Sequence, residues 1–413
     1  MIRMRNRIVL ALMLTAGVVS PAMSAEEKAA TQPAEPLKIV WGPYLQNVTP
    51  RSVTLLWTAG EATEGVVEFE AGEPKLPRRT GPGKQFIPLP KDKYAQRKTS
   101  PLSKDHEVTL TGLKPGVVYS YRVVSKRPGG GAPAASTVDS FQTTPENLKG
   151  FCFAIIGDTH TYRRSGEIVG RLLDESPRFI LHVGDYGSRV VSGLLKPYAP
   201  VMRRFPMYMA RGNHDSVKKH QQFVAMPGPG KDLHYSFRWG NARFIAVDTN
   251  DRKGIQKGGE QYKWLENELK TTKEKWKFVF QHHPIYSAWG GKMDPKFDDE
   301  RRLLEKYRVH VVFQGHMHNY DRSFPLRDKK VVRSDGVTYI TASGACGAQE
   351  WFPHPHRPWF VARQWRGEPF IGLCNVNGRK AIIQFMTAKG MLFDTIRLEL
   401  TDHKARDDRA AAK

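Results

Sequence analysis

Short apolar runs with strand-like patterns fill an early part of the chain. Residues 52–57 are β-branched, apolar and aromatic, residues 65–70 alternate with period two, and a similar run at 118–123 follows a Pro-Gly turn. Short strands separated by such turns are typical of a β-sandwich of about a hundred residues. The pattern therefore predicts an all-β domain at residues 37–145, with a long basic loop at 78–98.

A different pattern occupies the following part of the chain. Residues 151–156 form a continuous apolar run, which is typical of a strand buried on both faces. Segments with helical spacing alternate with further apolar runs at 260–280 and again at 299–313. Because alternating strands and helices favour a layered α/β domain, we predict such a domain at residues 146–401.

The amino terminus has the pattern of a secretory signal. Three arginines within the first seven residues precede an apolar run at 8–19, and small residues follow before Ala25. The alternative is an uncleaved anchor, but this run is shorter than the roughly 17–25 residues that span a bilayer. We predict a signal peptide at 1–24, a linker at 25–36 and an exported protein, periplasmic or secreted, without a transmembrane segment after cleavage.

Composition narrows the function only slightly. Apolar residues make up 40% of the 413 residues, which excludes global disorder, and residues 402–413 form a charged tail. The formal net charge of +23 suits anionic partners without naming one. No nucleic-acid-binding module, Gly-rich phosphate loop or Gly-x-Ser-x-Gly elbow is visible, so we expect no specific nucleic-acid binding. Three cysteines are too few for a disulfide scaffold, and whether two of them pair stays open.

Candidate metal ligands follow each predicted buried strand of the second domain. The five clusters are Gly-Asp-Thr-His at 157–160, Gly-Asp at 184–185, Gly-Asn-His-Asp at 212–215, Gln-His-His-Pro at 281–284 and Gln-Gly-His-Met-His at 314–318. The carboxyl ends of adjacent strands in an α/β sheet converge on one crevice, so we expect these side chains to meet in one pocket. Oxygen and nitrogen donors without thiolate suit Zn, Mn or Fe.

The number of candidate ligands is sufficient for two metal ions. Two ions about 3.5–4 Å apart can stabilise both the attacking and the leaving oxygen of a displacement at phosphorus. Adjacent residues on a strand point to opposite faces, so at most one of His282 and His283 is expected to be a ligand. The predicted ligands are Asp158, His160, Asp185, Asn213, His282, His316 and His318.

These five clusters resemble the motif blocks of the calcineurin-like metallophosphoesterase superfamily. Residues 41–50 and 109–116 are similar to the amino-terminal domain of purple acid phosphatases. The resemblance implies a fibronectin-III-like sandwich followed by a four-layer α/β/β/α domain. It also implies a metal-dependent phosphoric ester hydrolase that cleaves small anionic phosphate monoesters by in-line attack of a metal-bound hydroxide.

The resemblance assigns roles to the metal ligands and to His214. It implies one metal held by Asp158, His160, Asp185 and His318. It implies a second metal held by the bridging Asp185 with Asn213, His282 and His316. His214 would protonate the leaving oxygen, with Asp215 as a candidate to orient it, and the predicted substrate-binding residues are Asn213, His214 and Lys292.

Two departures from the purple acid phosphatase pattern leave alternatives open. Ser188 stands where that family has a tyrosine ligand, and His160 stands where it usually has no imidazole, so we expect a colourless enzyme. Gly291 and Lys292 replace further histidines, and Lys292 is equally well interpreted as a solvated loop residue. A phosphodiesterase and an inactive exported binding module are the alternatives, and the metals, natural ester and oligomeric state stay open.

Overall fold

The computed structural model describes residues 35–72, 94–160, 164–227, 233–345 and 357–400. The predicted signal peptide and charged tail, nearly all of the linker and most of the basic loop lie outside the described residues. None of the helices formed by the described residues is both long and apolar enough to cross a membrane.

The first described part of the chain is all-β, as its sequence pattern predicts. Its strands are β1 (Ile39–Gln46), β2 (Ser52–Ala71), β3 (Gln96–Thr111), β4 (Val118–Lys126), β5 (Ala134–Ala135) and β6 (Asp139–Gln142). The first half of β2 pairs with β1 and the second half with β4, while β3 lies beside both halves. The β2–β3 register shifts between Thr58 and Thr63 and again between Thr63 and Gly65.

Two further large sheets follow the sandwich. The first has the order β23-β22-β21-β7-β8-β9 and the second β10-β11-β12-β15-β19-β16-β20. The first sheet consists of β7 (Gly150–Ile156), β8 (Ile180–His182), β9 (Met207–Met209), β21 (Phe370–Asn377), β22 (Lys380–Thr387) and β23 (Leu392–Glu399). The second consists of β10 (Tyr235–Trp239), β11 (Ala242–Val247), β12 (Trp276–Gln281), β15 (Val311–Gln314), β16 (Tyr320–Ser323), β19 (Thr338–Ala342) and β20 (Val361–Trp365).

Helices and two short ribbons complete the described fold. The helices are α1 (Ser165–Glu175), π-helix η1 (Val191–Leu195), α2 (Ala199–Met202), α3 (Val217–Phe223), α4 (Glu260–Thr271), 3-10 helix η2 (Pro295–Phe297) and α5 (Asp298–Lys306). The ribbons pair β13 (Tyr286–Ser287) with β14 (Lys292–Met293) and β17 (Leu326–Arg327) with β18 (Lys330–Val331).

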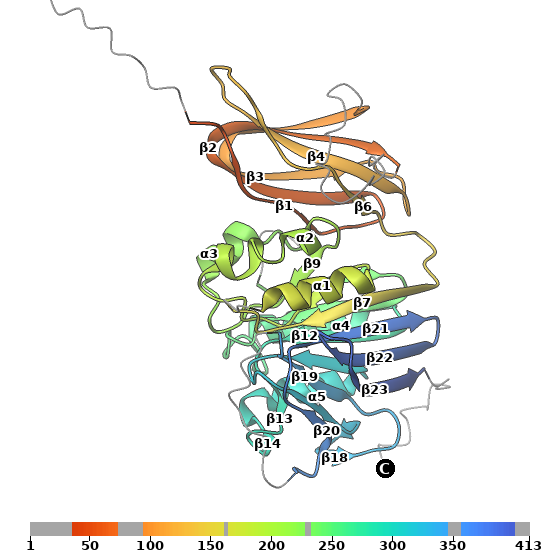
Figure 1. Cartoon of the computed structure of the whole chain (residues 1–413). Coiled ribbons are helices and arrows are strands. Elements are labelled where there is room, and N and C mark those ends of the chain that lie inside the picture. Colours follow the sequence, from red (N-terminus) through yellow and green to blue (C-terminus); the bar gives the residue numbers. More distant parts are fainter. Residues whose placement is uncertain (1–34, 73–93, 161–163, 228–232, 346–356, 401–413) are drawn as a thin grey trace, which may run out of the picture. The chain divides into compact units, whose positions relative to one another are not determined.

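Aromatic side chains join the faces of the two large sheets. Phe153 of β7 contacts Phe244 of β11 at 5.1 Å and Phe278 of β12 at 5.5 Å between ring centroids. The next residue of β12, Val279, lies in a second core cluster that includes Leu265 of α4. Because alternate strand residues face opposite sides, the helices cover the outer face of this sheet. The predicted four-layer α/β/β/α architecture is confirmed (Figure 1).

The sandwich and the layered part share one hydrophobic core cluster, and residues from Leu37 onward form one compact unit. The Tyr44 hydroxyl donates a hydrogen bond to the Phe223 carbonyl at 2.6 Å. The Tyr208 hydroxyl donates in the other direction, to the Val48 carbonyl at 3.3 Å. The sandwich is therefore part of the structure that supports α3 and β9.

Substitutions of Tyr208 measure how much these contacts contribute to the free energy of unfolding. Its ring stacks on Phe237 at 3.7 Å and is 1% exposed, so Tyr208→Ala is expected to lower the free energy of unfolding by about 3–5 kcal/mol. Tyr208→Phe removes only the bond to the Val48 carbonyl and should lower it by about 1 kcal/mol. Urea unfolding curves of both variants measure the two effects. Equal losses would show that ring packing contributes nothing.

The two cysteines in the described residues are free thiols. Cys152 of β7 lies opposite Asn375, whereas Cys374 of β21 lies opposite Phe153. The one-residue offset directs the two side chains to opposite faces of the sheet, so they do not pair with each other. Cys346 lies outside the described residues.

Glu300 of α5 is fully buried, and this burial raises the pKa of its carboxyl to about 8, although the Gln281 side chain and the charge of Arg252 lower it. An unfolded glutamate has a pKa of about 4.3. At a pH between these two pKa values, the Glu300 carboxyl is therefore protonated in the folded state and ionised in the unfolded state. Its contribution to stability is complete below the unfolded pKa and is lost as the pH rises through about 8.

We expect the wild-type protein to lose stability relative to Glu300→Gln as the pH rises from 5 to 8, by up to about 1.4 kcal/mol per pH unit. The glutamine keeps the size of the side chain and does not titrate. Urea midpoints of both proteins across this range measure the difference. Parallel pH profiles would contradict a raised pKa at Glu300.

Candidate metal centre

The five ligand clusters meet at one edge of the two large sheets. They follow β7, β8 and β9 in the first sheet and β12 and β15 in the second. Within each of these sets, neighbouring strands run parallel. Their carboxyl ends therefore point the same way, and the structure brings the predicted histidines and aspartates together in two groups.

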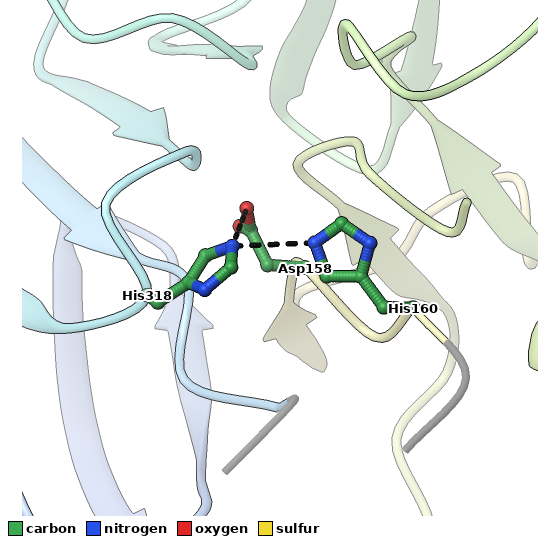
Figure 2. Close-up of side chains that lie close together, drawn as sticks. All are labelled: Asp158, His160 and His318. Atoms are coloured by element: carbon green, nitrogen blue, oxygen red, sulfur yellow. Dashed lines mark hydrogen bonds and ion pairs between the residues drawn. The ribbon is translucent and has the colours of Figure 1, made fainter. Parts of the chain in front are cut away.

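The first group contains Asp158, His160 and His318, with one ligand atom of each within 4.8 Å of the others. The two imidazoles face one another, with Nε2 of His160 at 3.2 Å from Nε2 of His318 (Figure 2). The same His318 nitrogen lies 3.6 Å from Oδ1 of Asp158. Two nitrogens and one carboxylate oxygen thus converge on one point.

The second group contains Asp185, His282 and His316, again with ligand atoms within 4.8 Å of one another. Nε2 of His282 lies 3.2 Å from Oδ2 of Asp185 and 3.2 Å from Nδ1 of His316. Oδ1 of Asn213 lies 2.9 Å from the same His282 nitrogen. The amide predicted as a ligand is therefore at this group.

Asp185 lies between the two groups. Its Oδ2 atom, which contacts His282, is also 3.8 Å from Nε2 of His160 in the first group. Its Oδ1 atom accepts a hydrogen bond from the His214 amide at 2.9 Å. This is the position that a carboxylate shared between two ions would need.

The atoms around Nε2 of His282 are arranged as metal ligands would be. Nδ1 of His282 lies 3.0 Å from the Val183 carbonyl, a contact that requires the proton on Nδ1 and leaves Nε2 without one in the neutral ring. That Nε2 then faces two acceptors, Oδ1 of Asn213 and Oδ2 of Asp185. Three acceptor atoms need a positive charge among them, and a metal ion bound here would supply it.

The charges in the site agree with this interpretation. Burial lowers the pKa of His282, but the hydrogen bond and charge of Asp185 outweigh it and raise this pKa to about 9. Burial also raises the pKa of Asp185, and the interaction with His282 brings it below its ordinary value. A proton on His282 therefore takes the place of a cation. Burial lowers the pKa values of His160 and His316 to about 4, which keeps both rings neutral and able to bind a metal.

Five of the candidate ligands have a left-handed backbone, which is uncommon outside glycine. These positive φ angles are 54° at Asp158, 41° at His160, 57° at Asp185, 76° at His316 and 50° at His318. Backbone hydrogen bonds hold two of them, from Asp158 N to Gly184 O at 2.9 Å and from His160 N to Asp185 O at 3.1 Å, and the amides of Asp185 and His316 donate to buried carboxylates. The scaffold therefore fixes the ligands in conformations that they do not prefer.

Two motif glycines allow the ligand loops to pack this closely. A Cβ atom at Gly212 would overlap the Oδ1 atom and the backbone nitrogen of Asp185. A Cβ atom at Gly315 would lie 2.6 Å from the Val183 carbonyl and 2.9 Å from Oδ2 of Asp158. The glycines are thus required by the approach of neighbouring ligand segments.

His214 lies at the open side of the centre. Its side chain is exposed, and its ring centroid is 5.4 Å from that of His160. The amide of His214 is held by Asp185, so the imidazole is placed next to both ligand groups. An exposed imidazole here is accessible to a substrate.

The contacts of Asp215 differ from the expected orienting role. Its buried carboxylate accepts hydrogen bonds from the amides of Asp185, Gly187 and Gly212, each at 2.8 Å. In the part of the chain that the structure describes, no hydrogen bond joins this carboxylate to the imidazole of His214. Adjacent residues in a tight loop point in different directions, and Asp215 points inward. Its contacts hold the Asp185 loop in place, and the catalytic role predicted for Asp215 stays a prediction.

Lys292 and Ser188 lie at the surface. Lys292 is exposed on β14, which pairs with β13 after the fourth ligand cluster. No hydrogen bond or ion pair of its side chain is found among the described residues. Ser188 is also exposed, and its carbonyl accepts a hydrogen bond from Lys219 at 2.6 Å. The substrate contact predicted for Lys292 stays a prediction.

Sequence reasoning missed two sets of supporting residues. His182 lies between the first two ligand loops, with Nε2 at 3.0 Å from the Thr159 hydroxyl and Nδ1 accepting from the Gly184 amide. The sequence feature that could have indicated this role is a histidine inside an otherwise apolar strand.

Arg211 forms an ion pair with Asp248 at 2.9 Å and thereby connects the third ligand loop to the end of β11. Asp248 follows a buried strand, as the predicted ligands do.

Comparison with known proteins identifies the class. Residues 152–320 match the family model of calcineurin-like phosphoesterases. The protein is a hydrolase with the metallophosphoesterase fold.

Its relatives include acid phosphatases. Acid phosphatase type 7 of Mus musculus is 25% identical over 365 residues, covering 76% of this chain and 80% of that protein. Purple acid phosphatase 15 of Arabidopsis thaliana is 24% identical over 53% of this chain, and this chain spans about half (49%) of its length. The structure of the purple acid phosphatase PPD1 from yellow lupin (Lupinus luteus) superimposes with a TM-score of 0.71 at 17% identity, covering 86% of this chain and 74% of that chain. The resemblance noted in the sequence is confirmed.

Proposed function

We propose that the protein is an exported phosphatase that uses two metal ions to hydrolyse small phosphate monoesters. The convergence of two ligand groups on Asp185 carries this proposal. Relatives named acid phosphatase support the substrate class. When bound, such ions lower the pKa of a water molecule and stabilise negative charge on a phosphoryl group.

We assign the predicted ligands to the two ions as follows. The first ion would be held by Asp158, His160, Asp185 and His318, and the second by Asp185, Asn213, His282 and His316. The identity of the ions as Fe, Zn or Mn is open. We place the catalytic domain at 146–401 and the sandwich at 37–145.

His214 is the residue that we assign to the leaving group. An alkoxide leaves poorly without a proton, and an exposed imidazole beside both ligand groups is placed to donate one. Asn213 and Lys292 are the further candidates for contact with the phosphoryl oxygens. Lys292 would act as a point charge.

His214→Ala is expected to reduce kcat/KM for phenyl phosphate by about a hundredfold or more, since general acid catalysis contributes roughly this much. The loss for p-nitrophenyl phosphate should be smaller, because p-nitrophenolate leaves without a proton. His234→Ala, which changes a histidine outside the ligand groups, is the control and should keep both activities. Equal losses on both esters would exclude the acid role.

A phosphodiesterase is the second candidate function. It is favoured by His160, which lies in the first ligand group, and by Ser188 in place of a tyrosine ligand. Turnover of p-nitrophenyl phosphate and bis-p-nitrophenyl phosphate after reconstitution with Zn, Mn or Fe separates the two functions. A higher kcat/KM for the monoester supports the phosphatase, and a higher value for the diester reverses the assignment. The absence of bound metal after reconstitution would instead favour the inactive binding module.

Export is tested separately. We expect the mature protein to begin at Ala25, and amino-terminal sequencing of protein recovered outside the cytoplasm checks this. Full-length chain found in a membrane fraction would show an uncleaved anchor.

A further inference from the structure

A cavity lies at the edge of the second large sheet that is opposite to the ligand groups. Its volume is about 640 Å³, and it is lined by residues at the starts of strands, namely Trp276 of β12, His310 before β15 and Thr338 of β19. The metal ligands His282 and His316 follow the ends of β12 and β15. Six residues of strand span about 20 Å, so this cavity is separate from the metal centre.

Positively charged residues dominate the wall of this cavity. Three acidic residues also line it, but Glu274 lies 3.4 Å from Arg243 outside the cavity and is partly neutralised there. Among the described residues, no carboxylate forms an ion pair with Arg308, Arg333 or Arg397. The six cationic residues of the wall are Lys275, Lys277, Arg308, Arg333, Arg379 and Arg397.

His310, at the floor of the cavity, adds one neutral donor to this charge. Nδ1 of His310 accepts a hydrogen bond from the Lys277 amide at 3.1 Å, so its proton is on Nε2 in the neutral ring. Burial lowers the pKa of His310 to about 4, which keeps the ring neutral. The Trp276 ring packs against it at 4.8 Å.

Lys277 and Arg308 place like charges together at this floor. Burial lowers the pKa of Lys277, and the charge of Arg308 lowers it further. The Lys277 ammonium donates to the Tyr307 carbonyl at 2.7 Å, which holds it in place. Like charges at a partly buried site destabilise the empty cavity, and a bound anion would relieve the repulsion.

We propose that this cavity binds a small polyanion that carries phosphate groups, at a site distinct from the metal centre. Its volume lies within the roughly 300–1,000 Å³ typical of ligand sites. Guanidinium groups donate paired hydrogen bonds to phosphate oxygens. Six cationic and three acidic residues line the cavity, and the surplus of three positive charges favours a ligand with several negative charges. The assignment is independent of the proposed phosphatase activity.

Calorimetric titration of the full chain with methylenediphosphonate, which phosphatases do not hydrolyse, tests the proposal. Binding should persist when the metals are removed by chelation, since the cavity does not use them. Arg308→Ala/Arg397→Ala should raise the Kd of the metal-free chain at least tenfold and leave p-nitrophenyl phosphate turnover of the loaded enzyme unchanged.

Lys273→Ala/Lys380→Ala is the matched control, because it removes the same charge from exposed residues that do not line the cavity. It should change the Kd less than twofold. Equal weakening in both double variants, no binding at millimolar concentration, or loss of binding in Asp185→Ala would overturn the proposal. Equally tight binding of citrate would overturn the preference for phosphate.

Discussion

Asp185→Ala is expected to reduce phosphoester hydrolysis by about a thousandfold or more, the largest effect of any single substitution in this chain. The Asp185 carboxylate contacts imidazoles of both ligand groups, at 3.2 Å from His282 and 3.8 Å from His160. Its removal therefore weakens both proposed ions. The measurement is kcat/KM for p-nitrophenyl phosphate, together with the number of ions bound per chain by elemental analysis.

Two further variants show whether the loss of activity comes from the charge of Asp185 or from removing any buried carboxylate. Asp185→Asn keeps an acceptor for the His214 amide but removes the charge, and it should also lose metal. Asp139→Ala removes a buried carboxylate of the sandwich that pairs with Arg204, and it should keep metal and activity. Activity of Asp185→Ala within tenfold of wild type would discredit the site.

Gly212→Ala should reduce activity by about a hundredfold or more although it adds only a methyl group. The new Cβ would overlap the carboxylate and backbone nitrogen of Asp185, so the ligand loop must move. A displacement of about 1 Å at a catalytic group can by itself cost a hundredfold in rate. We expect a lower kcat and weaker metal binding, with the folded state retained.

Gly129→Ala is the matched substitution, since no atom lies within 4 Å of the position of its added Cβ. Circular dichroism of both variants verifies that each chain is folded. Unchanged metal affinity and turnover in Gly212→Ala would show that the two loops do not constrain one another.

The layered fold and the grouping of the ligands were accessible from sequence because both follow from strand periodicity. An apolar run ends, a polar cluster follows, and parallel strands bring the clusters to one edge. The direction of Asp215 was not accessible, because adjacency to His214 does not determine where a side chain points in a tight loop. Its three amide partners appear only once two loops meet.

Long-range packing was equally inaccessible. The sequence pattern divides the chain near residue 146, and nothing local indicates that Tyr44 bonds to the carbonyl of Phe223, 179 positions away. The left-handed backbone at the ligands was not accessible either: a positive φ is less rare for aspartate and histidine than for most residues, but it is still uncommon at any one position.

Those five left-handed residues have a consequence for how the protein acquires its ions. Their conformations are held by backbone hydrogen bonds and by neighbouring loops, none of which requires a metal. We therefore expect metal loading to be binding to an already folded chain rather than folding driven by the ion. One ion would then exchange for another without unfolding of the chain. The metal content of the isolated protein would therefore depend on which metal ions were available to it, as well as on the affinity of its ligands for each metal.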